Sequence, residues 1–137
     1  MNARRQGNRI PGYRAYGGVL IVSTLLNRGT RAYMMVDSGA AYCCIMPEMA
    51  RLLGYDLRRP TARRSIASVQ GVEAEVPGFR LQSLQVEGII VQALDVLVIT
   101  LSPRLRIDGV LGVNFLERFR STFDFDTATL ILRARSV

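Results

Sequence analysis

The hydrophobic positions of the chain recur mostly in short runs and alternations, which predict β-strands rather than long helices. Residues 19–26 and 31–36 are rich in β-branched and other apolar side chains, and the Asn-Arg-Gly-Thr stretch between them favours a hairpin turn. Further strands are predicted, from apolar runs or alternation, at residues 42–46, 66–69, 72–76, 79–86, 89–101 and 130–133. The pattern therefore predicts a mostly β domain.

Two short helices interrupt the strands. The first is predicted over residues 47–53, because it begins with a proline, carries Glu48 near its positive end and is followed by Gly54. The second is predicted within residues 107–119, where an apolar strand passes into a helix. Residues 1–15 are polar, arginine-rich and broken by proline and glycine, so they predict a flexible arm ahead of one folded domain at 16–137.

Composition narrows the possible partners. The chain has 137 residues and a net charge of +7, with 18 basic residues that are all arginine. These arginines are spread along the chain without interleaved aromatic residues, so a solvated basic face is favoured over a nucleic-acid surface. Nucleic-acid binding stays an alternative that would show salt-sensitive association. No apolar run approaches the ~20 residues of a membrane helix, so no membrane segment is predicted.

The cysteines and the lack of histidine limit the chemistry. Cys43 and Cys44 are adjacent, and neighbouring cysteines rarely reach disulfide geometry without strain. We expect both to be small core residues in a reducing compartment such as the cytoplasm. The chain has no histidine, which excludes histidine-dependent triads and removes most zinc sites. No metal or other cofactor is predicted.

Asp37 is the main candidate for chemistry. It follows the apolar run 33–36 and precedes Ser38 and Gly39, which is either a tight turn or a loop that holds a carboxylate for reaction. A carboxylate between apolar strands is partly desolvated and needs a partner, which a second copy of the same residue across a two-fold axis would supply.

Three other aspartates are weaker candidates. Asp126 begins an Asp-Thr-Ala sequence that lacks the glycine of Asp-Ser-Gly, so a turn before the last strand is predicted there. Asp108 precedes Gly109, where a turn or capping role is expected. Asp124 is expected to be solvated or paired with an arginine.

The sequences VDSGA at 36–40 and DGVLGVNFL at 108–116 resemble the retropepsin-like aspartic proteases, especially their bacterial single-domain members. The resemblance runs from about residue 19 to residue 132. It implies an acid-protease fold with one lobe per chain. It also implies a homodimeric endopeptidase, which hydrolyses a peptide or protein substrate with a water activated between Asp37 of each subunit.

The resemblance also implies roles for individual residues. Asp37 would be catalytic, Ser38 would brace the loop across the dimer, and Gly39 and Ala40 would complete the loop. The tip of a flap over the substrate would comprise Ser68, Val69, Gln70, Gly71 and Val72, without an aromatic residue. The apolar-apolar-Gly strand behind the active loop would comprise Val110, Leu111 and Gly112. The terminal segments, including residues 130–137, would join the dimer sheet.

One alternative within the same fold stays open. The chain could be a catalytically inactive module that serves for dimerisation or peptide binding and keeps Asp-Ser-Gly for turn geometry alone. This alternative predicts folded dimers that cleave no peptide. The intact Asp37, Ser38 and Gly39 favour the enzyme, since an inactive site would be free to lose its carboxylate.

Overall fold

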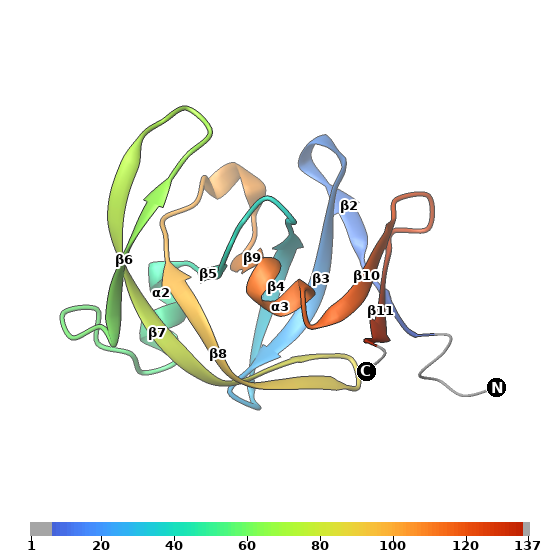
Figure 1. Ribbon diagram of the computed structural model, residues 1–137, viewed down its shortest axis with the longest axis horizontal. Coiled ribbons are helices and arrows are strands. Elements are labelled where there is room, and N and C mark those ends of the chain that lie inside the picture. Colours follow the sequence, from blue (N-terminus) through green and yellow to red (C-terminus); the bar gives the residue numbers. More distant parts are fainter. Residues whose placement is uncertain (1–6, 136–137) are drawn as a thin grey trace.

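The computed structural model describes residues 7–135 and consists mainly of two β-sheets (Figure 1). The larger sheet has the strand order β2-β3-β4-β9-β5-β8-β7-β6, and the smaller has the order β1-β11-β10. The larger sheet contains β2 (Tyr13–Ala15), β3 (Val19–Leu26), β4 (Thr30–Val36), β5 (Cys43–Ile45), β6 (Ala62–Ala67), β7 (Glu73–Val86), β8 (Ile89–Val98) and β9 (Gly109–Leu111). The smaller sheet contains β1 (Asn8–Pro11), β10 (Phe119–Asp124) and β11 (Thr129–Ala134).

Two α-helices occur within residues 7–135: α2 (Pro47–Leu52) and α3 (Val113–Leu116). Two single 3₁₀ turns accompany them, η1 (Tyr16–Gly18) and η2 (Pro103–Leu105). The prediction of a mostly β fold with two short helices is therefore confirmed. None of the helices in this part of the chain is long and apolar enough to cross a membrane.

The larger sheet folds back on itself around the core. Strand β3 pairs with β2 and β4, and its last two residues also pair with β7, with Leu25 opposite Gln85 and Leu26 opposite Leu84. This extra pairing joins strands that are distant in the order of the sheet, so the inner faces of the strands enclose a common apolar space.

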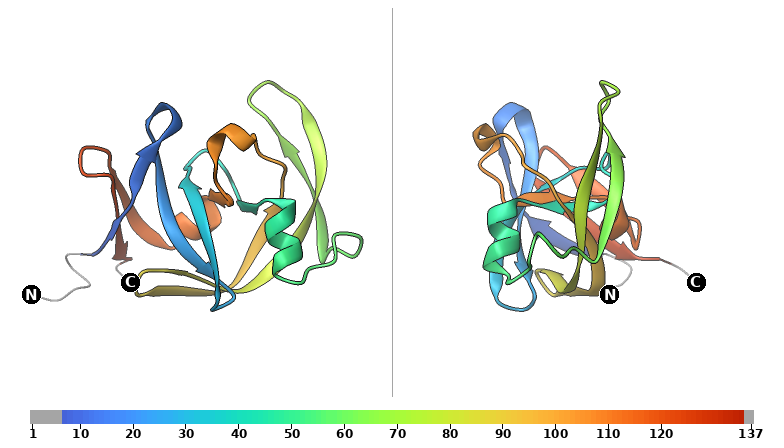
Figure 2. Two further views of the ribbon diagram at one scale, coloured as in Figure 1. Left: turned by 180° about the vertical axis from the view of Figure 1, so that it is seen from behind. Right: turned by 90° about the vertical axis from the view of Figure 1, so that its left-hand side faces the viewer.

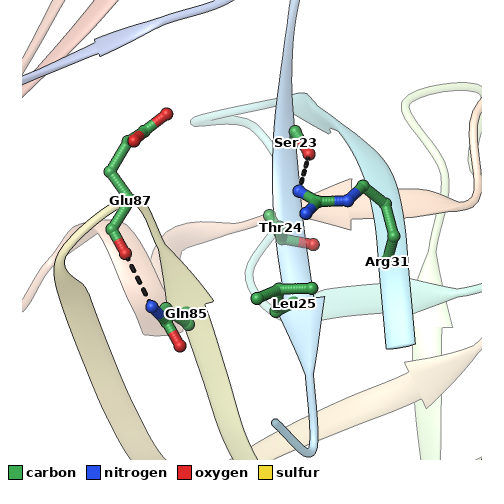
Figure 3. Close-up of a pocket in the computed structure, with 6 residues that line it drawn as sticks. All are labelled: Ser23, Thr24, Leu25, Arg31, Gln85 and Glu87. Carbon is green, nitrogen blue, oxygen red and sulfur yellow. Dashed lines mark hydrogen bonds between the residues drawn. The ribbon is translucent and has the colours of Figure 1, made fainter. Parts of the chain in front are cut away.

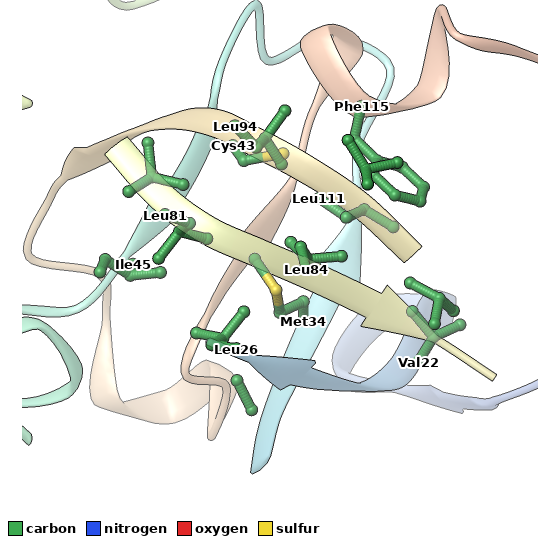
Figure 4. Packing of buried hydrophobic residues seen from close by; sticks show 14 of the residues in the cluster. Val22, Leu26, Met34, Cys43, Ile45, Leu81, Leu84, Leu94, Leu111 and Phe115 are labelled. Carbon is green, nitrogen blue, oxygen red and sulfur yellow. The ribbon is translucent and has the colours of Figure 1, made fainter. Parts of the chain in front are cut away.

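The main core fills that space with aliphatic side chains from several strands (Figure 4). Val22, Leu26 and Met34 come from the first hairpin, and Leu84 comes from β7; all four are fully buried. Phe115 of α3 is buried in the same cluster. Burial of each such side chain contributes about 1.5–3 kcal/mol of transfer free energy, so the core holds together the strands on either side of the loop that contains Asp37.

The N-terminal segment is ordered where the sequence predicted a flexible arm. Residues 8–11 and 13–15 form β1 and β2, so the prediction is wrong for this part of the 1–15 arm; residues 1–6 lie outside the described residues. Strand β1 pairs antiparallel with β11, and β2 pairs antiparallel with β3. Ile10 is 1% exposed, so one apolar anchor and two available sheet edges order a segment that is otherwise polar.

Strand β7 is longer than the sequence predicted. The predicted strands at 72–76 and 79–86 are one continuous strand, Glu73–Val86, despite Pro77 and Gly78 in its interior. Strand β6 pairs with β7 up to Gly78, and β8 pairs with β7 from Gly78 onward. The proline therefore lies where β7 changes partners, which is a position that tolerates a missing backbone donor.

Several loops gather on one side of the molecule. The β6–β7 hairpin, the η2 loop, the β2–β3 connection and the β10–β11 turn all extend to the upper side in Figure 1, and the view from behind shows the same arrangement (Figure 2). The loop between β4 and β5, which contains Asp37, lies among them.

Candidate active site

Asp37 is the first residue after β4, and its own loop orients its carboxylate. The backbone amide of Asp37 donates to the carbonyl of Leu111 at 3.0 Å, which anchors the start of the loop to β9. The amide of Gly39 donates to Oδ1 of Asp37 at 2.8 Å, and the amide of Ala40 donates to the carbonyl of Asp37 at 3.3 Å. The loop is therefore a tight turn that fixes a partly exposed carboxylate.

Strand β9 passes behind this loop, between β4 and β5. It runs parallel to β4, with Val36 opposite Leu111, and antiparallel to β5, with Cys44 opposite Val110. At Gly112 a Cβ atom would lie 2.6 Å from the carbonyl oxygen of Tyr42 and 2.7 Å from that of Ala40. Any residue other than glycine at position 112 would therefore require the backbone to shift where the chain passes behind the Asp37 loop.

Helix α3 is hydrogen-bonded to the residues that follow Gly39 in the loop. The amide of Val113 donates to the carbonyl of Ala40 at 2.7 Å, and the amide of Asn114 donates to the carbonyl of Ala41 at 3.1 Å. The side chain of Asn114 accepts from the amide of Cys43 and donates to the carbonyl of Asp95, both at 2.8 Å. The sequence predicted only that a strand passes into a helix within residues 107–119. The polarity of Asn114 in an otherwise apolar stretch was the available signal for these two bonds.

The two cysteines are free and buried, as the sequence predicted. Burial raises the pKa of the Cys43 thiol to about 11. Burial, with a smaller effect of Cys43 and the charge of Asp37, raises the pKa of Cys44 to about 12. Because a thiol must lose its proton to act as a nucleophile, neither cysteine is suited to that role near neutral pH. Among residues 7–135, no cluster of three or more ligating side chains could hold a metal ion.

A groove of about 520 Å³ lies on one side of Asp37. Its lining includes Tyr42, Cys44, Leu97 and Ile99, together with residues of the β6–β7 hairpin. The lining residues are Asp37, Gly39, Ala40, Ala41, Tyr42, Cys44, Ser65, Ile66, Ala67, Ser68, Val69, Leu97 and Ile99. Asp37 is the one carboxylate in this lining.

The predicted flap residues form the tip of the β6–β7 hairpin. Ser68 and Val69 line the groove, and residues 70–72 complete the turn beyond it. The amide of Ser68 donates to the carbonyl of Val72 at 2.9 Å, and Gly71 takes a left-handed conformation with φ of +84°. The structure thus places the predicted tip residues together, on the hairpin that faces the Asp37 loop.

A second hollow, of about 420 Å³, lies on the other side of Asp37. Its lining residues are Gly17, Gly18, Val19, Leu20, Val36, Asp37, Ser38, Phe123 and Phe125. Ser38 is exposed there, and Phe125 keeps 46% of its surface exposed. Asp37 therefore lies between two hollows, one under the hairpin and one beside β10.

A third, smaller hollow shares no lining residue with the groove (Figure 3). It has a volume of about 220 Å³ and a polar lining that includes Arg31, which donates to the hydroxyl of Ser23. Gln85 donates to the carbonyl of Glu87 in the same hollow. Neither Asp37 nor its neighbours in the loop line this hollow.

The three aspartates that the sequence offered as weaker candidates do not line the groove. Oδ2 of Asp108 accepts from the amide of Tyr33 at 2.8 Å, so its side chain joins the segment before β9 to β4, where the sequence suggested a local turn or capping role. Oδ1 of Asp124 accepts from the amide of Thr127 at 3.3 Å, so Asp124 caps the turn before β11. Asp126 lies in that turn, as predicted.

The chain has the retropepsin-like aspartic protease fold, in which one lobe carries one aspartate loop. It belongs to the family described as "gag-polyprotein putative aspartyl protease", whose model matches residues 22–118. Among solved structures, it is similar to a retropepsin-like aspartic protease from Rickettsia conorii, with a TM-score of 0.73 and 26% identity over 93% of this chain and 91% of that one.

The fold is also similar to the retroviral protease-like domain of Ddi1 from Leishmania major. That similarity has a TM-score of 0.54 and 21% identity, and it covers 83% of this chain and 87% of the other. No curated protein matches the sequence. The family and the fold that the sequence suggested are therefore confirmed.

Proposed function

We propose that the protein is an aspartic endopeptidase that works as a homodimer, with Asp37 of each subunit in one active site. The observation that carries this proposal is the position of Asp37, whose carboxylate is fixed by Gly39 at the junction of two hollows. Water activation between carboxylates needs a second acid, and neither hollow contains another carboxylate among its lining residues. A second copy of the chain would supply it.

In the proposed mechanism the two Asp37 carboxylates share one proton, because two like charges a few ångströms apart are costly. The ionised carboxylate takes a proton from water, and the water attacks the carbonyl carbon of the peptide bond. The protonated carboxylate donates to the developing oxyanion, and the amine leaves after a second proton transfer.

The proposal assigns the surrounding residues to positioning and binding. Exposed Ser38 would contact the second copy and brace the paired loops. The β6–β7 tip, residues 68–72, would close over the peptide in the groove. Val110, Leu111 and Gly112 would hold the loop from behind, which is the side where Leu111 accepts from the Asp37 amide.

The test is a peptide-cleavage assay at mildly acid pH with the intact protein and the Asp37→Asn variant. We expect cleavage that pepstatin, a transition-state analogue, inhibits, and a fall in kcat of about 100-fold or more in the variant. Asparagine keeps an oxygen for the Gly39 amide, so the variant retains the loop. Equal activity in both proteins would contradict the mechanism. Folded dimers that cleave no peptide would instead support the non-catalytic alternative.

A further inference from the structure

An arginine lies over the aromatic wall of the groove. The guanidinium carbon of Arg64, on β6, is 4.9 Å from the centroid of the Tyr42 ring. Tyr42 lines the groove a few residues after Asp37. Because successive side chains of a strand point to opposite faces, Arg64 and Ile66 face the protein while Arg63 faces solvent. Ile66 and Tyr42 pack against the same apolar cluster.

The charge of Arg64 has no carboxylate partner among residues 7–135, where the ion pairs are Arg58–Asp56 and Arg80–Asp95. On β7 the residue opposite Arg64 is Val76. Glu75 is opposite Ser65, and it is exposed. Arg64 is partly buried and is not itself a lining residue, but it stacks on Tyr42, which is. Its guanidinium therefore lies next to the groove with its hydrogen-bonding capacity available for a ligand.

Resting on the proposed function, we propose that Arg64 determines specificity by binding the carboxylate of an Asp or Glu side chain of the peptide substrate. Tyr42 is the positioning residue, since its ring holds the guanidinium at the wall of the groove. Arg64 would bind one acidic side chain of the peptide, on the side of Asp37 where the β6–β7 hairpin lies.

The chemistry of the pair supports an acidic ligand. A guanidinium over an aromatic face is attracted to the ring and keeps its N–H donors along its edge, where a carboxylate can accept two parallel hydrogen bonds. The ring also removes water from one face of the cation, which strengthens its interaction with a charged acceptor. The net charge of +7 would further favour the approach of acidic segments.

The test uses matched short peptides that differ only by Glu or Gln, with the exchange moved through each position around the cleaved bond. Two quantities are measured: kcat/KM on the intact protein, and peptide binding to the Asp37→Asn variant, which does not depend on cleavage. We expect one position at which Glu is preferred over Gln by about tenfold in both measurements.

The chain offers a matched control in the neighbouring arginine. Arg64→Met should abolish the preference for Glu at that position. Arg63→Met removes the same charge from an exposed position that is not stacked on Tyr42, and it should leave the preference intact. Tyr42→Phe keeps the ring and should keep the preference. Tyr42→Leu should weaken it, mainly through KM rather than kcat.

The outcomes separate this inference from the proposed function. Cleavage without any Glu preference, or a preference that survives in Arg64→Met, overturns the role of Arg64 and leaves the peptidase standing. Binding with an Arg64-dependent preference but no cleavage supports the subsite and contradicts the peptidase. Absence of both binding and cleavage overturns both.

Discussion

Asp37 and Leu111 are joined through their backbones, with the Asp37 amide donating to the Leu111 carbonyl at 3.0 Å. The bond links the end of β4 to the end of β9, so the loop that carries the carboxylate is attached to a strand far along the chain. Strand β9 is in turn held between β4 and β5. The position of Asp37 therefore depends on residues that line neither of the two hollows beside it.

Gly112 is the first such residue, and we expect Gly112→Ala to destabilise the protein. The added Cβ would meet the backbone carbonyls of Tyr42 and Ala40, which cannot move without shifting the loop. Overpacking of this kind costs about 1–3 kcal/mol, measurable by urea unfolding. Gly88→Ala is the control, since a Cβ there has no neighbour within 4 Å and the residue has no positive φ. Equal stability of the two variants would contradict the close crossing.

Asn114 is the second residue on which the position of Asp37 depends. Asn114→Ala leaves the amide of buried Cys43 without its acceptor, so we expect a loss of about 1–3 kcal/mol in unfolding free energy. Asn114→Asp retains that acceptor but cannot donate to the carbonyl of Asp95. The loss of unfolding free energy in this variant should therefore differ from that of the alanine variant. If both variants unfold like the unmodified protein, the hydrogen bonds of the Asn114 side chain contribute nothing to stability. Denaturant titration of the three proteins decides between these results.

The predicted and observed folds agree most closely where local pattern and tertiary structure favour the same conformation. Residues 19–26 were predicted as a strand and form β3, and the predicted helix at 47–53 differs from α2 by one residue. The Asp-Ser-Gly turn was likewise visible, because its residues favour a turn through local hydrogen bonds. Family membership followed from two short motifs around Asp37 and Gly112.

The disagreements occur where a distant partner determines the conformation. Residues 8–15 are polar and contain Pro11 and Gly12, and they become strands only because β11 and β3 offer edges to pair with. The stacking of Arg64 on Tyr42 also could not be predicted, since it depends on how the β6–β7 hairpin lies against the groove. The local sequence around Arg64 and Tyr42 does not predict the position of that hairpin.

The buried thiols predict a loss of stability at alkaline pH. The pKa values of Cys43 and Cys44 rise from 9.0 to about 11 and about 12 in the folded protein, chiefly through burial. Above pH 9 the unfolded chain releases these protons while the folded chain keeps them, so the unfolded state binds fewer protons and stability falls as pH rises. Each cysteine contributes up to about 1.4 kcal/mol per pH unit in this window.

The comparison is the double variant Cys43→Ala/Cys44→Ala, followed by denaturant titration at several pH values from neutral to alkaline. The variant should start less stable but decline less steeply, because it lacks the two thiols whose pKa values are raised in the folded state. Parallel declines would show that the cysteines do not keep their protons in the folded state.

In the proposed dimer two chains share one active site, and mixing the unmodified protein with Asp37→Asn tests this arrangement. If each site needs Asp37 from both subunits, exchange with an equal amount of the variant lowers activity per unmodified chain to about one half, and a tenfold excess lowers it to about one tenth. Inactive mixed dimers account for this fall. Activity per unmodified chain that stays constant at every ratio, after subunit exchange is complete, would contradict the account.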